Sequence, residues 1–351
     1  MAAKKRFKDQ LITYGMVIAA YIIMEALMMT GNLSSHLKGL LVPMTYYAII
    51  AVALNLCVGI LGELSIGHCG FMCIGAFSSA LFSKITENSI PTGPRFFLAF
   101  VIGIAVAALF GFLIGIPVLR LNGDYLAIVT LAFGEIIKNV INAVYLGVDK
   151  NGLHVSLKNA MELGMEPDGQ VIINGAMGIT GTPHNANFTI AVIVLLISLF
   201  VVLNLINSRD GRAIMAVRDN NIAAEASGIN VTGYKMMAFT ISAAIAGAAG
   251  VLFSHNITSL TASSQYFGYN ASIMILVYVV LGGIGNIRGS VIAAVILYLL
   301  PELLRGLNNY RMLIYAIVLI VMMIFNWSPG VIDFRKRMVA KFKKGGSHGA
   351  A

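Results

Sequence analysis

Ten stretches of the chain are nearly free of charged residues and long enough to be considered as helices in a bilayer. They lie at about 11–30, 39–61, 64–83, 96–118, 124–147, 188–206, 236–254, 271–283, 291–304 and 311–326. A helix that crosses the hydrocarbon core needs about 20 mostly apolar residues. The runs are continuous rather than alternating, which indicates helices. The pattern predicts an all-α, polytopic membrane protein with about ten transmembrane helices.

Composition and charge support this class. The chain is 58% hydrophobic and 11% charged, whereas soluble domains average about 25% charged residues. The net charge of +9 does not indicate a nucleic-acid partner, because the basic residues gather at the two ends. These are Lys4, Lys5, Arg6, Lys8, Arg335, Lys336, Arg337, Lys341, Lys343 and Lys344. We therefore predict cytoplasmic tails at 1–10 and 335–351, around one membrane domain at 11–334.

Threading ten spans from a cytoplasmic start predicts the side of each loop. The basic residues placed on the cytoplasmic side then outnumber the others by about two to one, as the positive-inside rule requires. The longest hydrophilic loop, 148–187, falls on the periplasmic side, and the segment 207–235 falls in the cytoplasm.

Residues 59–77 place five glycines, Ser65 and His68 in a run that is otherwise apolar enough to enter the membrane. Irregular backbone at that depth is tolerated only inside protein or beside a cavity. The segment therefore predicts an interior element, which is either a wall of a translocation path or a tight packing turn. Cys69 and Cys73 follow His68 at helical spacing, but with no second cluster of ligands we predict no metal site.

Residues 120–139 carry Asp124, Glu135 and Lys138 into a predicted helix. Glu135 and Lys138 are three residues apart and can pair on one helix face. Ionisable groups in a span belong to a path or to the interior of a bundle. Both a structural ion pair and a substrate contact remain open here.

Two glycine-containing segments predict close packing and a turn. Residues 236–250 are mostly small, which lets helix backbones approach closely, and they predict a central, protein-packed helix. Residues 281–289 resemble a dinucleotide-binding turn, but the glycine spacing differs by one residue and the surrounding strand and helix pattern is missing. A turn between two spans is the better interpretation.

The cytoplasmic segment 207–235 predicts two short amphipathic helices, the first broken near Asp219 and Asn220 and the second ended by Gly228. Such a pair can dock on a protein partner, lie on the bilayer, or simply connect two spans. No GxxxxGK[ST] motif and no Ser-His-Asp or HExxH constellation occurs. We therefore expect no enzymatic activity and no bound cofactor, and any ATP hydrolysis must come from another subunit.

Four motifs resemble the LivM class of branched-chain amino-acid ABC-transporter permeases. The first two are LSIGHCGF at 64–71 and GDYLAIVTLAFGE at 123–135. The third comprises Gly211, Arg212, Arg218, Ala224, Glu225 and Gly228 in the cytoplasmic segment, and the fourth is VLGGIGNIRG at 280–289.

The resemblance implies a permease subunit of the bacterial inner membrane with an ABC-importer permease fold, working by alternating access. Its implied partners are a LivH-like permease, two ATPase subunits that hold ATP and magnesium, and a periplasmic binding protein. The six residues of the third motif would couple to the ATPases. The first two motifs offer candidates for the translocation path: Ser65, Gly67, His68, Tyr125, Thr130 and Glu135.

Three alternatives remain open. Related permeases serve urea or short amides, and a stand-alone secondary transporter or channel would also contain polar spans. A structural scaffold is disfavoured because it has no need of irregular, glycine-rich interior helices.

Overall fold

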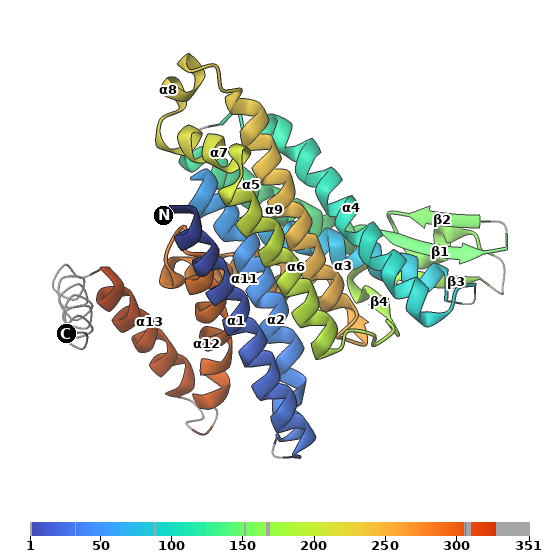
Figure 1. The fold of residues 1–351 in the computed structure, drawn as a ribbon. Coiled ribbons are helices and arrows are strands. Elements are labelled where there is room, and N and C mark those ends of the chain that lie inside the picture. Colours follow the sequence, from blue (N-terminus) through green and yellow to red (C-terminus); the bar gives the residue numbers. More distant parts are fainter. Residues whose placement is uncertain are drawn as a thin grey trace, which may run out of the picture. The chain divides into compact units, whose positions relative to one another are not determined.

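The computed structural model describes residues 2–327 except 32, 88, 122, 151, 166–168, 305 and 307–309 (Figure 1). The predicted C-terminal tail at 335–351 lies outside the described residues. The chain divides into two compact units, residues 1–295 and 296–351. The first unit contains every candidate site residue of the sequence motifs.

The described residues are mostly helical. The helices are α1 (Ala2–Met29), α2 (Ser35–Asn55), α3 (His68–Ile85), α4 (Thr92–Val118), α5 (Asp124–Ala143), α6 (Phe188–Asn207), α7 (Arg209–Asp219), α8 (Asn221–Ala226), α9 (Val231–Ser254), α10 (Ser264–Phe267), α11 (Tyr269–Gly282), α12 (Ile287–Leu303) and α13 (Arg311–Trp327). A π-helical segment η1 (Leu56–Leu61) extends α2, and two short 3-10 turns are η2 (Ala160–Leu163) and η3 (Gly175–Met177).

Seven helices among the described residues are long and apolar enough to cross a membrane. They are Gln10–Met29, Ser35–Leu61, Thr92–Val118, Asp124–Ala143, Phe188–Asn207, Val231–Ser254 and Ser264–Gly282. The other three predicted spans also fold as helices, but α3 has 18 residues and α12 and α13 have 17 each. A perpendicular span needs about 20 residues. The total of about ten spans therefore stays a prediction.

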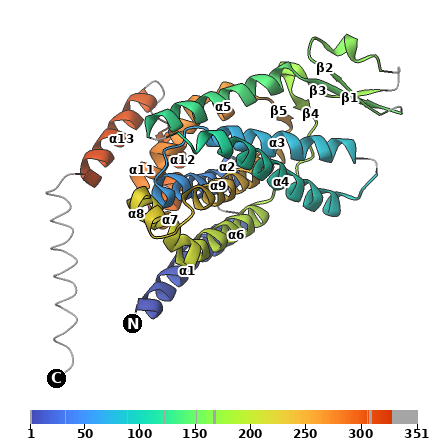
Figure 2. The same cartoon turned by 90° about the horizontal axis from the view of Figure 1, so that it is seen from above.

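Helix α9 runs through the first unit alongside α2, α3 and α4 (Figures 1 and 2). Its small residues permit this packing. A Cβ on Gly250 would collide with the backbone of α3 at Met72, and one on Gly247 would collide with Ala107 of α4. Nearly every residue from Ala238 to Ser254 is buried or half-buried. The prediction of a central, protein-packed helix is confirmed.

The expectation of an all-α chain is wrong in part, because the segment after α5 forms small sheets. The strands are β1 (Tyr145–Asp149), β2 (Gly152–Ser156), β3 (Gln170–Asn174), β4 (Ile179–Thr180) and β5 (Ser259–Leu260). The first three form an antiparallel sheet in the order β2-β1-β3, and β4 pairs with β5. This hydrophilic segment does not need helix to satisfy its backbone in lipid, and its β-branched and apolar residues alternate along β1 and β2.

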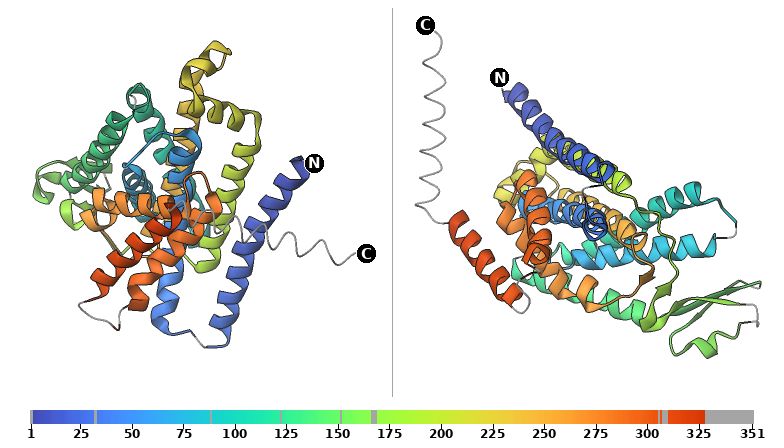
Figure 3. Two further views of the ribbon diagram at one scale, coloured as in Figure 1. Left: turned by 90° about the vertical axis from the view of Figure 1, so that its left-hand side faces the viewer. Right: turned by 90° about the horizontal axis from the view of Figure 1, so that it is seen from below.

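The two ends of α9 carry different structures. Helix α8 precedes its first residue, and β5, paired with β4, follows its last. The α7–α8 segment and the sheets consequently lie at opposite ends of this helix, as the right-hand view of Figure 3 shows.

Candidate functional site

The helix α2 breaks at the glycine-rich segment that the sequence singles out. Its last turns widen into the π-helix η1, which ends at Gly62 with a left-handed φ of 82°. Residues 62–67 are irregular, and α3 begins at His68. Ser65 and His68 are buried in this break. The prediction of an irregular interior element is confirmed, and π-helical segments of this kind are frequent at functional sites.

A chain of polar contacts crosses the break through His68. Its Nδ1 lies 3.0 Å from Ser65 Oγ, and its Nε2 lies 2.7 Å from Ser242 Oγ on α9. Ser242 donates its single hydroxyl hydrogen to the carbonyl oxygen of Ala53, 2.5 Å away. A neutral His68 would therefore donate from Nε2 and accept from Ser65 at Nδ1. The network joins α2, α3 and α9.

Replacing Ser242 with alanine tests this network. The change leaves the His68 Nε2–H and the Ala53 carbonyl without their shared partner, and we expect a loss of about 1–3 kcal/mol in the free energy of unfolding. Thermal unfolding of the purified protein in detergent measures it. The matched control is Ser198→Ala, because that buried hydroxyl donates to the Val194 carbonyl of its own helix rather than joining two helices; its effect should stay within about 0.5 kcal/mol. Equal losses in the two variants would contradict the network.

Helix α5 packs against the break through the second motif. Thr130 Oγ1 accepts a hydrogen bond from the Ile66 backbone at 3.1 Å. A Cβ on Gly67 would collide with the Thr130 carbonyl, and one on Gly70 would come within 2.8 Å of the Gly134 Cα. Ser65, Gly67, His68 and Thr130 are thus brought together, in packed surroundings rather than on an open surface.

The remaining path candidates lie elsewhere on α5. Tyr125 is on the exposed face, with 72% of its surface accessible. Glu135 pairs with Lys138, as the spacing predicts, and its Oε1 accepts from the Tyr269 backbone at 2.8 Å. Lys138 Nζ also donates to Ser264 Oγ at 2.9 Å. The ion pair therefore connects α5 to α10 and α11.

The cytoplasmic segment folds as the two predicted helices. Ser208 caps α7 by accepting from the Gly211 backbone, and Asn220 caps α8 by accepting from Ala223, both at 3.0 Å. Gly228 follows α8 with a φ of 81°. The break therefore falls at Asn220, as predicted.

The six coupling candidates divide into packed and exposed residues. Gly211 and Ala224 are buried, and a Cβ on Gly211 would collide with the Leu205 carbonyl. Arg212 and Glu225 are exposed, and Ile222 beside them is 81% accessible. Arg218 is also exposed, with 36% of its side chain accessible, but its Nη1 reaches the break and donates to the Gly59 carbonyl at 3.0 Å.

Sequence reasoning missed two long-range contacts at this junction. Lys235 Nζ lies 2.5 Å from Glu63 Oε1 in a buried ion pair between α9 and the break. Asn55 accepts from the Gly285 backbone at 2.8 Å and donates to Ser290 Oγ at 2.6 Å. Glu63 and Lys235 lie at the ends of apolar runs and have opposite charges, which is a weak sequence signal for their ion pair. A polar Asn55 inside an apolar span is a signal for its contact with another segment.

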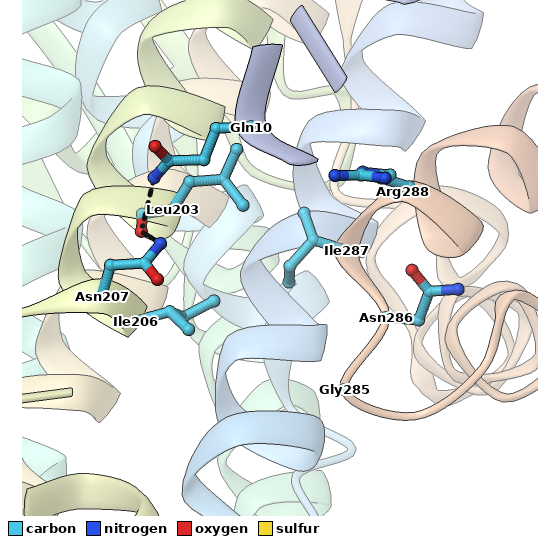
Figure 4. A pocket seen from close by; sticks show the side chains of 8 residues that line it. All are labelled: Gln10, Leu203, Ile206, Asn207, Gly285, Asn286, Ile287 and Arg288. Carbon is cyan, nitrogen blue, oxygen red and sulfur yellow. Dashed lines mark hydrogen bonds between the residues drawn. The ribbon is translucent and has the colours of Figure 1, made fainter. Parts of the chain in front are cut away.

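Two cavities border these elements. One of about 690 Å³ is lined by residues of the break, the α4–α5 turn, the α7–α8 turn and the start of α9, including Glu63, Asp124, Arg218 and Lys235. The other, about 380 Å³, lies between α1, α6 and the turn before α12 (Figure 4). There Gln10 and Asn207 both donate to the Leu203 carbonyl.

Residues 283–286 form the glycine turn that the fourth motif predicts. Gly283 and Gly285 adopt φ values of 96° and 80°, which side chains rarely permit. The turn connects α11 to α12, and a Cβ on Gly59 would collide with Gly285. Across residues 36–325 the chain matches the model of a family described as "Branched-chain amino acid transport system / permease component". The chain belongs to this family.

Individual relatives agree with the family match. This permease is 36% identical over 313 residues to LivM of the high-affinity branched-chain amino acid transport system of Salmonella typhimurium, covering 86% of this chain and 71% of that protein. It is 26% identical over 255 residues to the corresponding LivH of Escherichia coli, covering 72% and 79%. A probable LivM of Methanocaldococcus jannaschii is 26% identical over 225 residues, covering 60% and 57%.

The family match includes every element of the candidate sites in this permease. The break, α5, the α7–α8 segment and the glycine turn all fall within 36–325. Helix α1, which ends at Met29, precedes the matched region.

Proposed function

We propose that the chain is the membrane-spanning permease subunit of an ATP-driven importer of branched-chain amino acids. The proposal that transport is driven by ATP rests on the two faces of the α7–α8 segment. This segment presents Ile222 and Glu225 outward while Ile214 and Val217 are buried against the bundle. A segment that is anchored on one face and exposed on the other suits docking into a groove on a partner.

The proposed ATPase partners would supply the ATP-binding motif that this sequence does not contain. With no phosphate-binding motif of the GxxxxGK[ST] type, ATP and magnesium would bind to two separate ATPase subunits, and this chain would hold neither cofactor nor metal. Similarity to both a LivM and a LivH protein supports a second, LivH-like permease beside this one. A periplasmic binding protein would deliver the substrate.

The orientation follows from the two ends of α9. With α7–α8 in the cytoplasm, the sheets at the opposite end of α9 would face the periplasm and the binding protein. The distribution of basic residues supports two cytoplasmic termini in a bacterial inner membrane.

The proposed path follows α5. Tyr125 stands on its exposed face and Thr130 on the face that contacts the break. Ser65, Gly67 and His68 lie behind Thr130, so a shift of the break would move α5 and the surface that it presents to a second permease. Glu135 would hold α5 to α11 during this movement.

Copurification tests the assembly. We would express the chain with its neighbouring genes, purify it in detergent and determine which proteins accompany it. The proposal predicts two ATPase subunits and a second permease at fixed stoichiometry. A chain that purifies alone and moves solute in proteoliposomes without ATP would overturn it.

Replacing Glu225 with arginine is expected to weaken docking on the ATPase subunits. The carboxylate is exposed on α8, so the variant should reach the membrane in normal amounts. Reversing a charge at an interface costs several kcal/mol, so ATP-dependent uptake should fall at least about tenfold. Glu87→Arg, in the turn that follows α3, is the control and should transport normally. Normal uptake by the Glu225 variant would count against the coupling role.

A further inference from the structure

The π-helix η1 is held between two elements that meet at Gly59. On one side a Cβ at Gly59 would collide with the backbone of Gly285 in the glycine turn. On the other side its carbonyl oxygen accepts from Arg218 Nη1 at 3.0 Å. The last carbonyls of a helix have no partner within the helix. Arg218 therefore supplies a donor that the broken α2 cannot provide.

The stem of Arg218 contacts the same break. A Cβ on Gly62 would collide with Arg218 Cγ and lie 3.2 Å from its Cδ. Gly62 is the left-handed residue that ends η1, so the aliphatic stem rests on the point where the backbone changes direction. A single side chain thus touches both the start and the end of the segment 59–62.

The guanidinium also bonds its neighbour on α7. Asp219 Oδ1 accepts from Arg218 Nε at 3.0 Å and from Nη2 at 2.8 Å, which leaves Nη1 for Gly59. Val217, the neighbouring residue, is fully buried. Arg218 is the penultimate residue of α7, so a displacement of α7 also displaces its side chain.

We propose that Arg218 is a positioning residue that transmits movement of the α7–α8 segment to the break between α2 and α3. This role rests on the proposed function, because it requires α7–α8 to be moved by an ATPase. It differs from docking: Arg218 contacts the permease's own backbone, whereas Glu225 faces outward. The Glu63–Lys235 pair holds the residue after Gly62 to α9. A displacement of Gly59 and Gly62 by Arg218 would therefore change the backbone conformation of the break rather than move the whole break as a rigid body.

The test uses the full complex, with ATPase subunits, second permease and binding protein, in proteoliposomes. Leucine uptake and ATP hydrolysis are measured together for wild type, Arg218→Met, Arg218→Lys and the control Arg209→Met, an exposed arginine on the same helix. Arg218→Met should assemble and hydrolyse ATP normally, while leucine taken up per ATP falls by about tenfold, the factor expected for loss of one charge-assisted hydrogen bond. Arg209→Met should keep the wild-type ratio.

The lysine variant keeps an aliphatic stem and a positive charge on a single donor nitrogen, so its ratio should lie between those of wild type and Arg218→Met. It replaces the methionine variant in the test if that variant fails to accumulate. Loss of the ATPase subunits from the Arg218 variants would make Arg218 a docking residue and overturn the inference while the proposed function stands. An unchanged ratio in both variants would also overturn it. A wild-type chain that binds no ATPase would overturn the proposed function itself.

Discussion

Replacing Lys235 with methionine is expected to cost about 3–5 kcal/mol of folding free energy, the usual penalty for leaving one member of a buried ion pair without its partner. Lys235 and Glu63 are 5% and 9% exposed, and their charged atoms lie 2.5 Å apart. The Glu63 carboxylate would stay between α9 and the break with no cation to compensate it. The neighbouring cavity can admit water, so we expect a value near the lower end of this range.

Chemical or thermal unfolding in detergent measures the loss of folding free energy in Lys235→Met. Two further variants show whether the unpaired charge is its cause. In Lys84→Met the lost pair with Glu87 is partly exposed, so the cost should be under about 1 kcal/mol. The double change of Glu63 and Lys235 to methionine removes both charges and should recover most of the stability. A double variant that is no more stable than Lys235→Met would show that the charges are not the cause.

Replacing Gly75 with leucine is expected to prevent the protein from accumulating in folded form. Gly75 is on α3, and a Cβ there would lie 2.6 Å from the Gly247 Cα and 2.8 Å from its carbonyl carbon on α9. Backbone atoms cannot rotate away as a side chain can, so the two helices would have to separate. Overpacking costs about 1–3 kcal/mol when the neighbours can adjust, and here they cannot. Size-exclusion chromatography of the detergent extract gives the folded fraction.

Gly15→Leu is the matched control for this change. Gly15 lies in α1, and a Cβ there would meet nothing within 4 Å. Leucine also favours helix more than glycine does. We expect normal accumulation of this variant. A normal yield of Gly75→Leu would contradict the close contact between α3 and α9.

The elements that the sequence predicts well are those whose pattern is local. Continuous apolar runs located the helices, and the small residues of 236–250 identified α9 as the packed centre because only such residues let backbones approach. The α7–α8 pair was predicted with its break at Asn220 because capping and the helix-ending Gly228 depend on neighbouring residues. Glu135 and Lys138 could be paired for the same reason, since three residues separate them.

The rest depends on contacts between distant segments. Glu63 and Lys235 are 172 residues apart and Asn55 and Gly285 are 230 apart, so no local pattern could join them. The π-helix η1 has no composition that separates it from an α-helix. The sequence predicts a loop where the sheet after α5 forms, because the strands are short and lie in a hydrophilic segment, whose backbone groups water can satisfy. Arg218 was identified as a coupling candidate, but its bond to Gly59 required the fold.

The central claim is that this permease carries branched-chain amino acids when ATP is hydrolysed by its partners. The most direct measurement is uptake of labelled leucine into proteoliposomes that contain the assembled complex and its binding protein. Uptake is compared with and without ATP on the side of the membrane that the ATPase subunits face. We predict uptake that requires both ATP and this chain, and that isoleucine and valine inhibit but urea does not. Uptake by this chain alone without ATP, or transport of urea in place of leucine, would contradict it.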